Sequence, residues 1–231
     1  MEIFSKAAVP AEEKKTPAIL ITGGIHGDEY LGFEHQLPEW FLSSMDTQAE
    51  LRDFFSSGGR VFVIPIQNPD GFIDDTRTNA FGRDLNREFP ISKRETEPEV
   101  KAVTSWVART IGKKKRSLAL SMDYHCCTGA LLYPTFLRGR GPAALPSPTP
   151  FLKVGAVLRD VIHKTVGGLF RVGTSLEILG YQATGTAKDY FSEHYRSLSL
   201  TFEGQPDARN ALHAQKKLWA EILGKLNAGK L

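Results

Sequence analysis

The sequence predicts an α/β fold of three layers, in which helices cover both faces of a twisted, mixed but mostly parallel sheet. Two observations lead to this prediction. Short apolar runs rich in β-branched residues recur along the chain, and helical patterns lie between them. The 231 residues, of which 41% are hydrophobic, are enough for one sizeable core. We therefore expect a single domain spanning residues 1–231.

Four apolar runs predict buried strands. In chain order they cover residues 18–22, 61–66, 118–124 and 197–203. Parallel strands are covered on both faces, so their sequences are almost continuously apolar instead of alternating. These four runs therefore indicate the central strands of the sheet.

Four helical patterns alternate with these strands, over residues 29–42, 96–111, 150–165 and 207–226. Thr96 is the expected N-cap of the second helix, because acidic residues fill the turn that follows it. The Pro-, Gly- and Ala-rich segment 137–150 predicts a long surface loop. It is not expected to be a domain linker, since the chain that follows is too short for a second core.

Charge and cysteine content exclude several classes of protein. The net charge is +3, and apart from the run 112–116, an expected solvated loop, basic residues are interspersed with acidic ones. No nucleic-acid partner is therefore expected. The N-terminal segment contains acidic residues and no apolar core of a signal peptide, and no stretch of about 18 apolar residues occurs, which argues against a signal peptide and a membrane span. The two cysteines, Cys126 and Cys127, are adjacent and cannot join distant segments, so we expect a cytoplasmic protein.

Polar residues gather at the ends of the predicted strands, where open α/β sheets bind their ligands. His26 and Glu29 follow the first strand, Asp123 and His125 end the third, and Glu203 ends the last. Two imidazoles and a carboxylate, with one position left open, suit a catalytic zinc ion. We interpret His26, Glu29 and His125 as ligands of one Zn²⁺. Each residue also has a simpler reading, as a chance His-x-x-Glu spacing, a strand-end histidine, or a carboxylate facing the next helix.

A polar loop over residues 68–90 lies between the first and third proposed ligands. It opens with the turn "NPDG" and then carries Arg77, Arg83, Asp84, Asn86 and Arg87. Guanidinium groups bind carboxylates through paired hydrogen bonds. Their position near a metal therefore predicts a substrate with an anionic end.

Six motifs occur in a familiar order: "HGDE", "NPDGF", "TRTNAFGRDLNREFP", "DYHCCTGALLYP", "GYQATGTAKDYF" and "LTFEGQ". Over residues 18–204 their order and spacing resemble the zinc carboxypeptidases related to carboxypeptidase A and B. The chain is shorter than the digestive enzymes and looks more like compact bacterial members, some of which are murein peptide amidases. The resemblance implies a zinc carboxypeptidase-like fold and hydrolysis at the C-terminal residue of a peptide.

The resemblance implies roles for the residues that match the motifs of the family. His26, Glu29 and His125 match the zinc ligands, and Asp84 matches the carboxylate that orients the first histidine. Glu203 matches the general base and acid of the reaction.

Four further residues match positions that act on the substrate, of which Arg77 is implied to be catalytic and the other three to bind. Arg77 matches the arginine that polarises the scissile carbonyl group. Asn86 and Arg87 match the pair that holds the terminal carboxylate of the substrate. Tyr181 matches the mobile tyrosine that closes over the bound substrate. The expected partner is thus a peptide or murein peptide with a free C-terminal carboxylate.

Lys188 stands seven residues after Tyr181, where the resemblance implies the floor of the pocket for the terminal side chain. A buried ammonium group there predicts a preference for terminal Glu, Asp or another carboxylate-bearing residue such as diaminopimelate. A lysine that extends to solvent would give no such preference.

Two positions depart from the family pattern. Asp28 stands where the pancreatic enzymes carry a substrate-binding arginine, so the resemblance does not imply extended substrate binding. Cys126 could add a thiolate near the metal, although two histidines and a glutamate already complete a catalytic set.

Three alternatives to a carboxypeptidase remain open. The first is a cytoplasmic amidase that cleaves the γ-D-glutamyl-diaminopimelate bond of murein peptides with the same catalytic residues. The second is a deacylase resembling aspartoacylase and succinylglutamate desuccinylase, which "NPDGF" and the Tyr181 segment disfavour. The third is an inactive zinc-binding module that recognises C-terminal carboxylates, which Glu203 disfavours.

Overall fold

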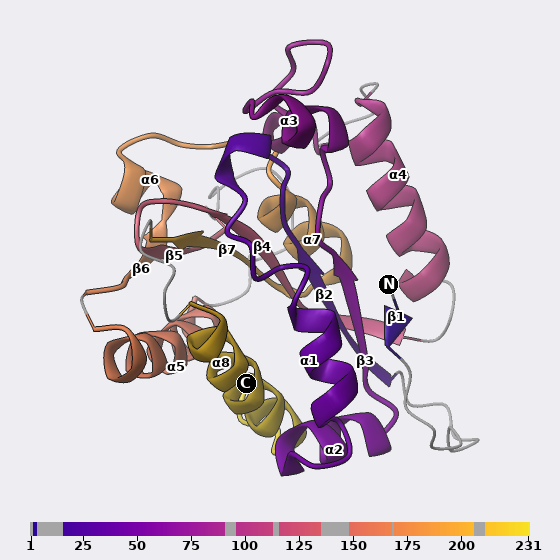
Figure 1. Cartoon of the computed structure of the whole chain (residues 1–231), viewed down its shortest axis with the longest axis vertical. Helices are drawn as coiled ribbons and strands as arrows, with labels where there is room; N and C mark the ends of the chain where they lie inside the picture. The colour runs from indigo at the N-terminus through magenta and orange to yellow at the C-terminus, as the bar shows by residue number, and fades with distance from the viewer. Residues whose placement is uncertain are drawn as a thin grey trace, which may run out of the picture.

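The computed structural model describes residues 2–3, 16–90, 96–112, 116–134, 148–167, 169–205 and 211–231, and the structural statements below concern these residues. They form one twisted sheet with helices packed against both faces (Figure 1). The predicted fold class is therefore confirmed. No helix in the described ranges is long and apolar enough to cross a bilayer.

The sheet has seven described strands in the order β1-β3-β2-β4-β7-β5-β6. Neighbouring strands run parallel except at two pairs, β1 with β3 and β5 with β7. The strands are β1 (Glu2–Ile3), β2 (Thr16–Thr22), β3 (Arg60–Ile64), β4 (Arg116–Cys126), β5 (Ala130–Tyr133), β6 (Arg171–Thr174) and β7 (Leu198–Gly204).

All four apolar runs form strands, as β2, β3, β4 and β7, and these occupy four adjacent positions in the sheet. The sequence did not predict β1, β5 or β6. These strands are two to four residues long and lie at or next to an edge of the sheet, so they carry little of the continuous apolar pattern of a central strand.

Side-chain alternation along β2 divides the core into two layers. Ile19 and Ile21 face one cluster of buried side chains, whereas Ala18 and Leu20 face the other. The first cluster is covered by α1 (Leu37–Ser44), α2 (Ala49–Ser56), α5 (Thr149–Thr165) and α8 (Ala211–Asn227). The second is covered by α4 (Pro98–Val107) and α7 (Ala187–Tyr195).

Shorter helices complete the described chain. They are α3 (Pro69–Asp74), α6 (Ser175–Leu179), the 3₁₀ helices η1 (Gly27–Glu29) and η2 (Leu85–Arg87), and the π-helical turn η3 (Ala108–Gly112). In the view of Figure 1, α3 lies at the top of the molecule, above the ends of the central strands.

The single helix expected over residues 29–42 is wrong. The structure has η1, then an irregular segment, and α1 begins only at Leu37. Gly32 adopts a φ of 85°, which interrupts helical geometry, and the Glu34 carboxylate accepts a hydrogen bond from the backbone N–H of Leu31 at 3.1 Å.

The expected N-cap Thr96 is also wrong. Its hydroxyl donates to the carbonyl oxygen of Glu88 at 2.6 Å, while Glu97 is the N-cap residue of α4 and Pro98 is its first residue. Proline suits this position because it has no N–H to leave unpaired. The expected loop 137–150 lies outside the described residues up to residue 147, and so do residues 113–115 of the basic run.

Glu34, in the irregular segment between η1 and α1, carries a fully buried carboxyl group. Its Oε2 atom has no hydrogen-bond partner in the described part of the chain, and burial raises its pKa from 4.5 to about 7. The folded state therefore favours the protonated side chain.

We expect Glu34 to make the protein less stable as the pH rises. An acid whose pKa is raised by folding stabilises the fold below its unfolded pKa, and this contribution is lost as the pH rises through the folded value. At about 1.4 kcal/mol per pKa unit, the loss between pH 4.5 and 8 is on the order of a few kcal/mol. Urea denaturation at pH 5 and pH 8 measures it. Glu34→Gln should remove most of this dependence, whereas Glu39→Gln, on an exposed part of α1, should keep it. An unchanged pH dependence in Glu34→Gln would contradict the assignment.

Candidate active site

The carboxyl ends of β2, β4 and β7 meet at one edge of the sheet and bring the predicted polar residues together. His125 of β4 lies opposite Glu203 of β7 in the strand register, and His26 follows the end of β2. The turn after β2 requires glycine at Gly27, because a Cβ atom there would lie 2.0 Å from the backbone of Gly71. This close approach sets the position of η1, which carries Glu29.

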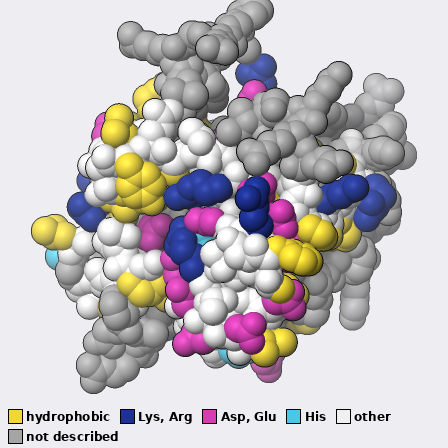
Figure 2. Space-filling view, turned by 90° about the horizontal axis from the view of Figure 1, so that it is seen from above, with side chains coloured by type: hydrophobic (Ala, Val, Ile, Leu, Met, Phe, Trp, Pro, Cys, Tyr) yellow, Lys and Arg dark blue, Asp and Glu magenta, His cyan; other side chains and the backbone are white. Residues whose placement is uncertain are grey.

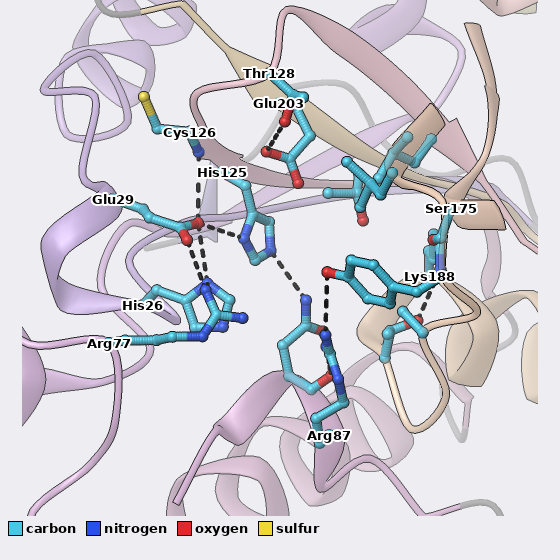
Figure 3. A pocket seen from close by; sticks show the side chains of 17 residues that line it. His26, Glu29, Arg77, Arg87, His125, Cys126, Thr128, Ser175, Lys188 and Glu203 are labelled. Carbon is cyan, nitrogen blue, oxygen red and sulfur yellow. Dashed lines mark hydrogen bonds and ion pairs between the residues drawn. The ribbon is translucent and has the colours of Figure 1, made fainter. Parts of the chain in front are cut away.

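His26, Glu29 and His125 form one compact cluster, with a possible ligand atom from each within 4.8 Å of the others. Oε2 of Glu29 lies 2.9 Å from Nδ1 of His26 and 2.9 Å from Nδ1 of His125 (Figure 3). The structure thus brings together the three residues that were interpreted as metal ligands.

Two further carboxylates hold the far sides of the imidazole rings. Asp84 Oδ1 lies 2.9 Å from Nε2 of His26, and Asp123 Oδ2 lies 2.9 Å from Nε2 of His125. A carboxylate can only accept, so each Nε2 carries the proton and donates it. Both Nδ1 atoms face Oε2 of Glu29 and donate to it in this structure. Once these protons are lost, as metal binding requires, both Nδ1 atoms would present lone pairs beside Glu29, which is the arrangement that zinc histidines adopt. The residues therefore fit a zinc ion.

Asp123 is itself fixed by two donors. The hydroxyl of Thr22 donates to its Oδ1 at 2.6 Å, and the amide of Gln67 donates to the same atom at 2.9 Å. The orientation of His125 therefore depends on contacts from β2 and from the segment after β3.

The charge of this cluster favours a cation. Burial would raise the pKa of Glu29, but hydrogen bonds from His125 and His26 outweigh it and hold the pKa well below its usual range. Burial would lower the pKa of His125, but Asp123 and Glu29 outweigh it and raise the pKa well above its usual range. The same carboxylates would favour a divalent cation in place of the protons.

The cluster of His26, Glu29 and His125 lines a cavity, and Arg77 lies beside the cluster and lines that cavity too. Its Nη1 donates to Glu29 Oε1 at 2.8 Å, and its Nη2 donates to Asp84 Oδ2 at 2.9 Å. Arg83, from the same loop, instead pairs with Glu88 at 2.9 Å and lies outside the cavity lining. Only part of the basic loop therefore faces the candidate site.

Glu203 is a buried carboxylate that lines the same cavity as His26, Glu29 and His125. Its Oε2 accepts a hydrogen bond from the hydroxyl of Thr128 at 3.1 Å. Burial raises the pKa of Glu203. The sulfur of Cys126 points away from Glu29 in Figure 3 and contacts the sulfur of Cys127. The described geometry therefore gives no support to a thiolate ligand.

The opposite side of the cavity carries groups that can bind an anion. Nη1 of Arg87 donates to the carbonyl oxygen of Asn86 at 2.8 Å, and Nη2 lies 3.5 Å from the hydroxyl of Tyr181. Oδ1 of Asn86 accepts from the backbone N–H of Ala187 at 3.1 Å, which fixes the amide beside His125. Tyr181 is half exposed at the rim.

Lys188 is buried, and so the alternative in which it extends to solvent does not describe this structure. Its side chain is 1% exposed and lines the cavity, and Nζ donates to Thr186 Oγ1 at 3.0 Å and to Asp189 Oδ2 at 3.3 Å. Burial lowers the pKa of Lys188, and the carboxylate of Asp189 opposes this shift.

Figure 2 views the molecule from above this edge of the sheet. Basic and acidic side chains lie next to one another at the centre of the face, and hydrophobic side chains lie to either side. Asp28 is exposed and does not line the cavity, which measures about 170 Å³. Asp28 therefore lies outside the candidate site.

Sequence reasoning assigned no role to several residues of the site. Asp123 stands two positions before His125 on one strand, so the two share a face, and this spacing could have indicated the contact. No local pattern predicts that Thr128 contacts Glu203. No local pattern predicts either that Ser175 and Thr201 line the cavity.

Fold and site together define a class: α/β proteins with a two-histidine, one-carboxylate site at the carboxyl edge of a mixed sheet. The family model described as zinc carboxypeptidase matches residues 1–221, and the chain belongs to this family. The resemblance drawn from the six motifs is thus confirmed.

Individual proteins agree with this membership. The chain is 32% identical over 109 residues to carboxypeptidase SOL1 of Arabidopsis thaliana, covering 42% of the chain and 22% of SOL1. Its fold matches that of thrombin activatable fibrinolysis inhibitor with a TM-score of 0.73 at 21% identity, over 97% of the chain and 65% of that protein. It matches the fold of murein-tripeptide amidase MpaA of Escherichia coli O157 with a TM-score of 0.54 at 20% identity, over 93% of the chain and 84% of MpaA. The chain thus spans about a fifth of the length of SOL1.

We expect Asp123→Ala to weaken zinc binding about 10- to 100-fold, because His125 would lose the acceptor that fixes its ring and its tautomer. Competition with a chromogenic chelator measures this affinity. Asp160→Ala, on an exposed part of α5, serves as the control and should bind zinc as the unmodified chain does. Equal affinities in all three proteins would show that Asp123 does not support the metal site.

Proposed function

We propose that residues 1–231 form a single zinc-dependent carboxypeptidase domain that hydrolyses the C-terminal amide bond of peptides. One observation carries the proposal: the buried carboxylate of Glu203 shares a cavity with the His26–Glu29–His125 cluster and with Arg87. Such a cavity offers a base, a cation site and an anchor for a carboxylate. Membership of the zinc carboxypeptidase family supports the same function.

One Zn²⁺, held by Nδ1 of His26, Nδ1 of His125 and the Glu29 carboxylate, would supply Lewis acidity and lower the pKa of a water molecule. Arg87 and Asn86 bind the terminal carboxylate of the substrate and so fix the position of the scissile bond. Tyr181, beside the Arg87 guanidinium, covers the bound residue.

Glu203 accepts the proton of the attacking water and returns it to the leaving amine. The raised pKa of Glu203 suits both steps, because a base that is too weak could not take the proton. Thr128 donates to Oε2, so in this proposal Oε1 is the oxygen that takes the proton. The Arg77 guanidinium, oriented by Asp84, stabilises negative charge on the carbonyl oxygen.

Lys188 gives the pocket its preference for a terminal residue that carries a carboxylate. Its ammonium group is buried on the cavity wall, where it would attract an acidic side chain and repel a basic one.

A second candidate substrate is a murein peptide with a γ-D-glutamyl-diaminopimelate bond. The second carboxylate of diaminopimelate would suit Lys188 as well as the side chain of glutamate does. The fold similarity to MpaA, named as a murein-tripeptide amidase, makes this substrate worth testing, although similarity at 20% identity speaks to the fold alone.

We expect Glu203→Gln to lower kcat by about 10²- to 10⁴-fold, because the amide cannot accept the proton. Zinc content and folding should stay unchanged, since Glu203 is not among the ligands of the cluster. Steady-state hydrolysis of a peptide series, with zinc measured on the same samples, tests this. Glu193→Gln, exposed on α7, is the control. Undiminished hydrolysis by Glu203→Gln would overturn the mechanism.

We expect the zinc-loaded protein to release C-terminal Glu faster than Leu, and Leu faster than Lys, from otherwise identical peptides. Lys188→Met should remove most of the advantage of Glu over Leu, because a methionine fills similar space without a charge. Lys164→Met, exposed on α5, should keep the order. Mass spectrometry of the products gives the rates, and a chelator arm shows that they depend on metal.

Murein tripeptide belongs in the same assay. Faster cleavage of this substrate than of every α-linked peptide would favour the amidase. Faster release of Lys than of Glu would contradict the role of Lys188.

A further inference from the structure

Two hydroxyl groups on the wall of the cavity lack partners. Ser175 Oγ and Thr201 Oγ1 are buried and have no hydrogen-bond partner in the described part of the chain. The residues are 1% and 2% exposed, and both line the cavity that contains Glu203 and Lys188. Buried polar groups in native proteins nearly always have partners. Two hydroxyls without a protein partner on the wall of one cavity are therefore available to a ligand that enters it.

Both hydroxyls lie in the part of the cavity away from the cluster of His26, Glu29 and His125. Thr201 precedes Glu203 by two residues on β7, so the two side chains share a face and Thr201 lies deeper along the strand. Its neighbour across β5 is Leu132, which also lines the cavity. Figure 3 shows Ser175 and Lys188 on the opposite side of the view from Glu29 and Arg77.

The chemistry of this region fits a carboxylate. An ammonium group has three N–H donors. Lys188 contacts Thr186 Oγ1 at 3.0 Å and both oxygens of the Asp189 carboxylate, at 3.4 and 3.3 Å. The two long contacts to one carboxylate can share a single N–H, which would leave one for a ligand. Each hydroxyl adds one donor. A carboxylate only accepts, and its two oxygens offer about four sites, so it can accept from all three groups.

Apolar residues also line the cavity, and they suit the methylene groups of a side chain. They include Leu132, Leu179 and Ala183. An alkyl stem with a carboxylate at its end therefore matches both these apolar residues and the three donors.

We infer that Ser175 and Thr201 are specificity-determining residues, whose hydroxyls donate, together with Lys188, to the side-chain carboxylate of the terminal residue of the substrate. This inference rests on the proposed function and extends it from one charge to a three-donor site. The site also rejects apolar termini, because an alkyl group would leave three buried donors unpaired.

The test compares peptides that end in Glu, Gln and Leu, hydrolysed by the zinc-loaded protein and by Ser175→Ala and Thr201→Val. We expect each variant to lower kcat/KM for the Glu peptide about tenfold and to raise it for the Leu peptide, because one unpaired donor is removed. A residue with only a structural role would lower both rates together. Glutamine has the shape of glutamate without its charge, so its rate separates hydrogen bonding from charge.

Matched controls keep the result interpretable. Thr201→Ser retains the hydroxyl and should restore the preference for Glu. Ser199→Ala lies two residues earlier on the same strand, where the hydroxyl contacts Ser197, and should leave the Glu-to-Leu ratio unchanged. If Ser175→Ala, Thr201→Val and the unmodified chain all show the same ratio of kcat/KM for the Glu peptide to kcat/KM for the Leu peptide, the inference is overturned and the proposed function stays intact.

A binding measurement separates the two proposals if no peptide is cleaved. Absence of hydrolysis by the zinc-loaded protein would overturn the proposed function. Calorimetry with free glutamate and free leucine then tests the site directly. Tighter binding of glutamate, weakened about tenfold by either variant, would support the three-donor site. Equal binding of both amino acids would overturn it.

Discussion

The parallel register of β2, β4 and β7 is the constraint on which the rest of the site depends. Hydrogen bonding between these strands sets Asp123 opposite Thr22 on one side and Thr201 on the other, and sets His125 opposite Glu203. A shift of one residue would turn each of these side chains to the opposite face of the sheet. The apolar layers on both faces fix that register, so the packing of the core determines the geometry of the polar edge.

The charged groups around the two histidines, buried or partly buried, are stable because they pair with one another. His26 and His125 lie between Glu29 and the carboxylates of Asp84 and Asp123, and Arg77 spans Glu29 and Asp84. Removal of one partner from such a network leaves a buried charge uncompensated, which costs more than the lost contact itself. The orientation of His125 therefore depends on Thr22 and Gln67 as well, because these two residues hold Asp123, which in turn holds the imidazole ring.

The sequence predicted the central strands and the grouping of His26, Glu29 and His125, but not the parts that depend on tertiary contacts. Residues 118–124 form a strand because a continuous apolar run suits a position that is buried on both faces. Residues 29–42 look helical in isolation, yet Gly32 and the buried carboxylate of Glu34 interrupt the helix. His26 and Glu29 are three residues apart and could be paired from sequence. Thr201 gains its significance only from a cavity formed by several elements, which no local pattern encodes.

The three cations of the cavity differ in how far their charge is already offset. Arg77 pairs with Glu29 and Asp84, and Lys188 contacts Asp189. Arg87 contacts a carbonyl oxygen and the hydroxyl of Tyr181, and in the described ranges no carboxylate pairs with it. An incoming terminal carboxylate would therefore meet its strongest attraction at Arg87. The partly neutralised Lys188 would hold a second carboxylate less firmly by charge alone, which is why unpaired hydroxyls on the same wall would matter for the choice of the terminal residue.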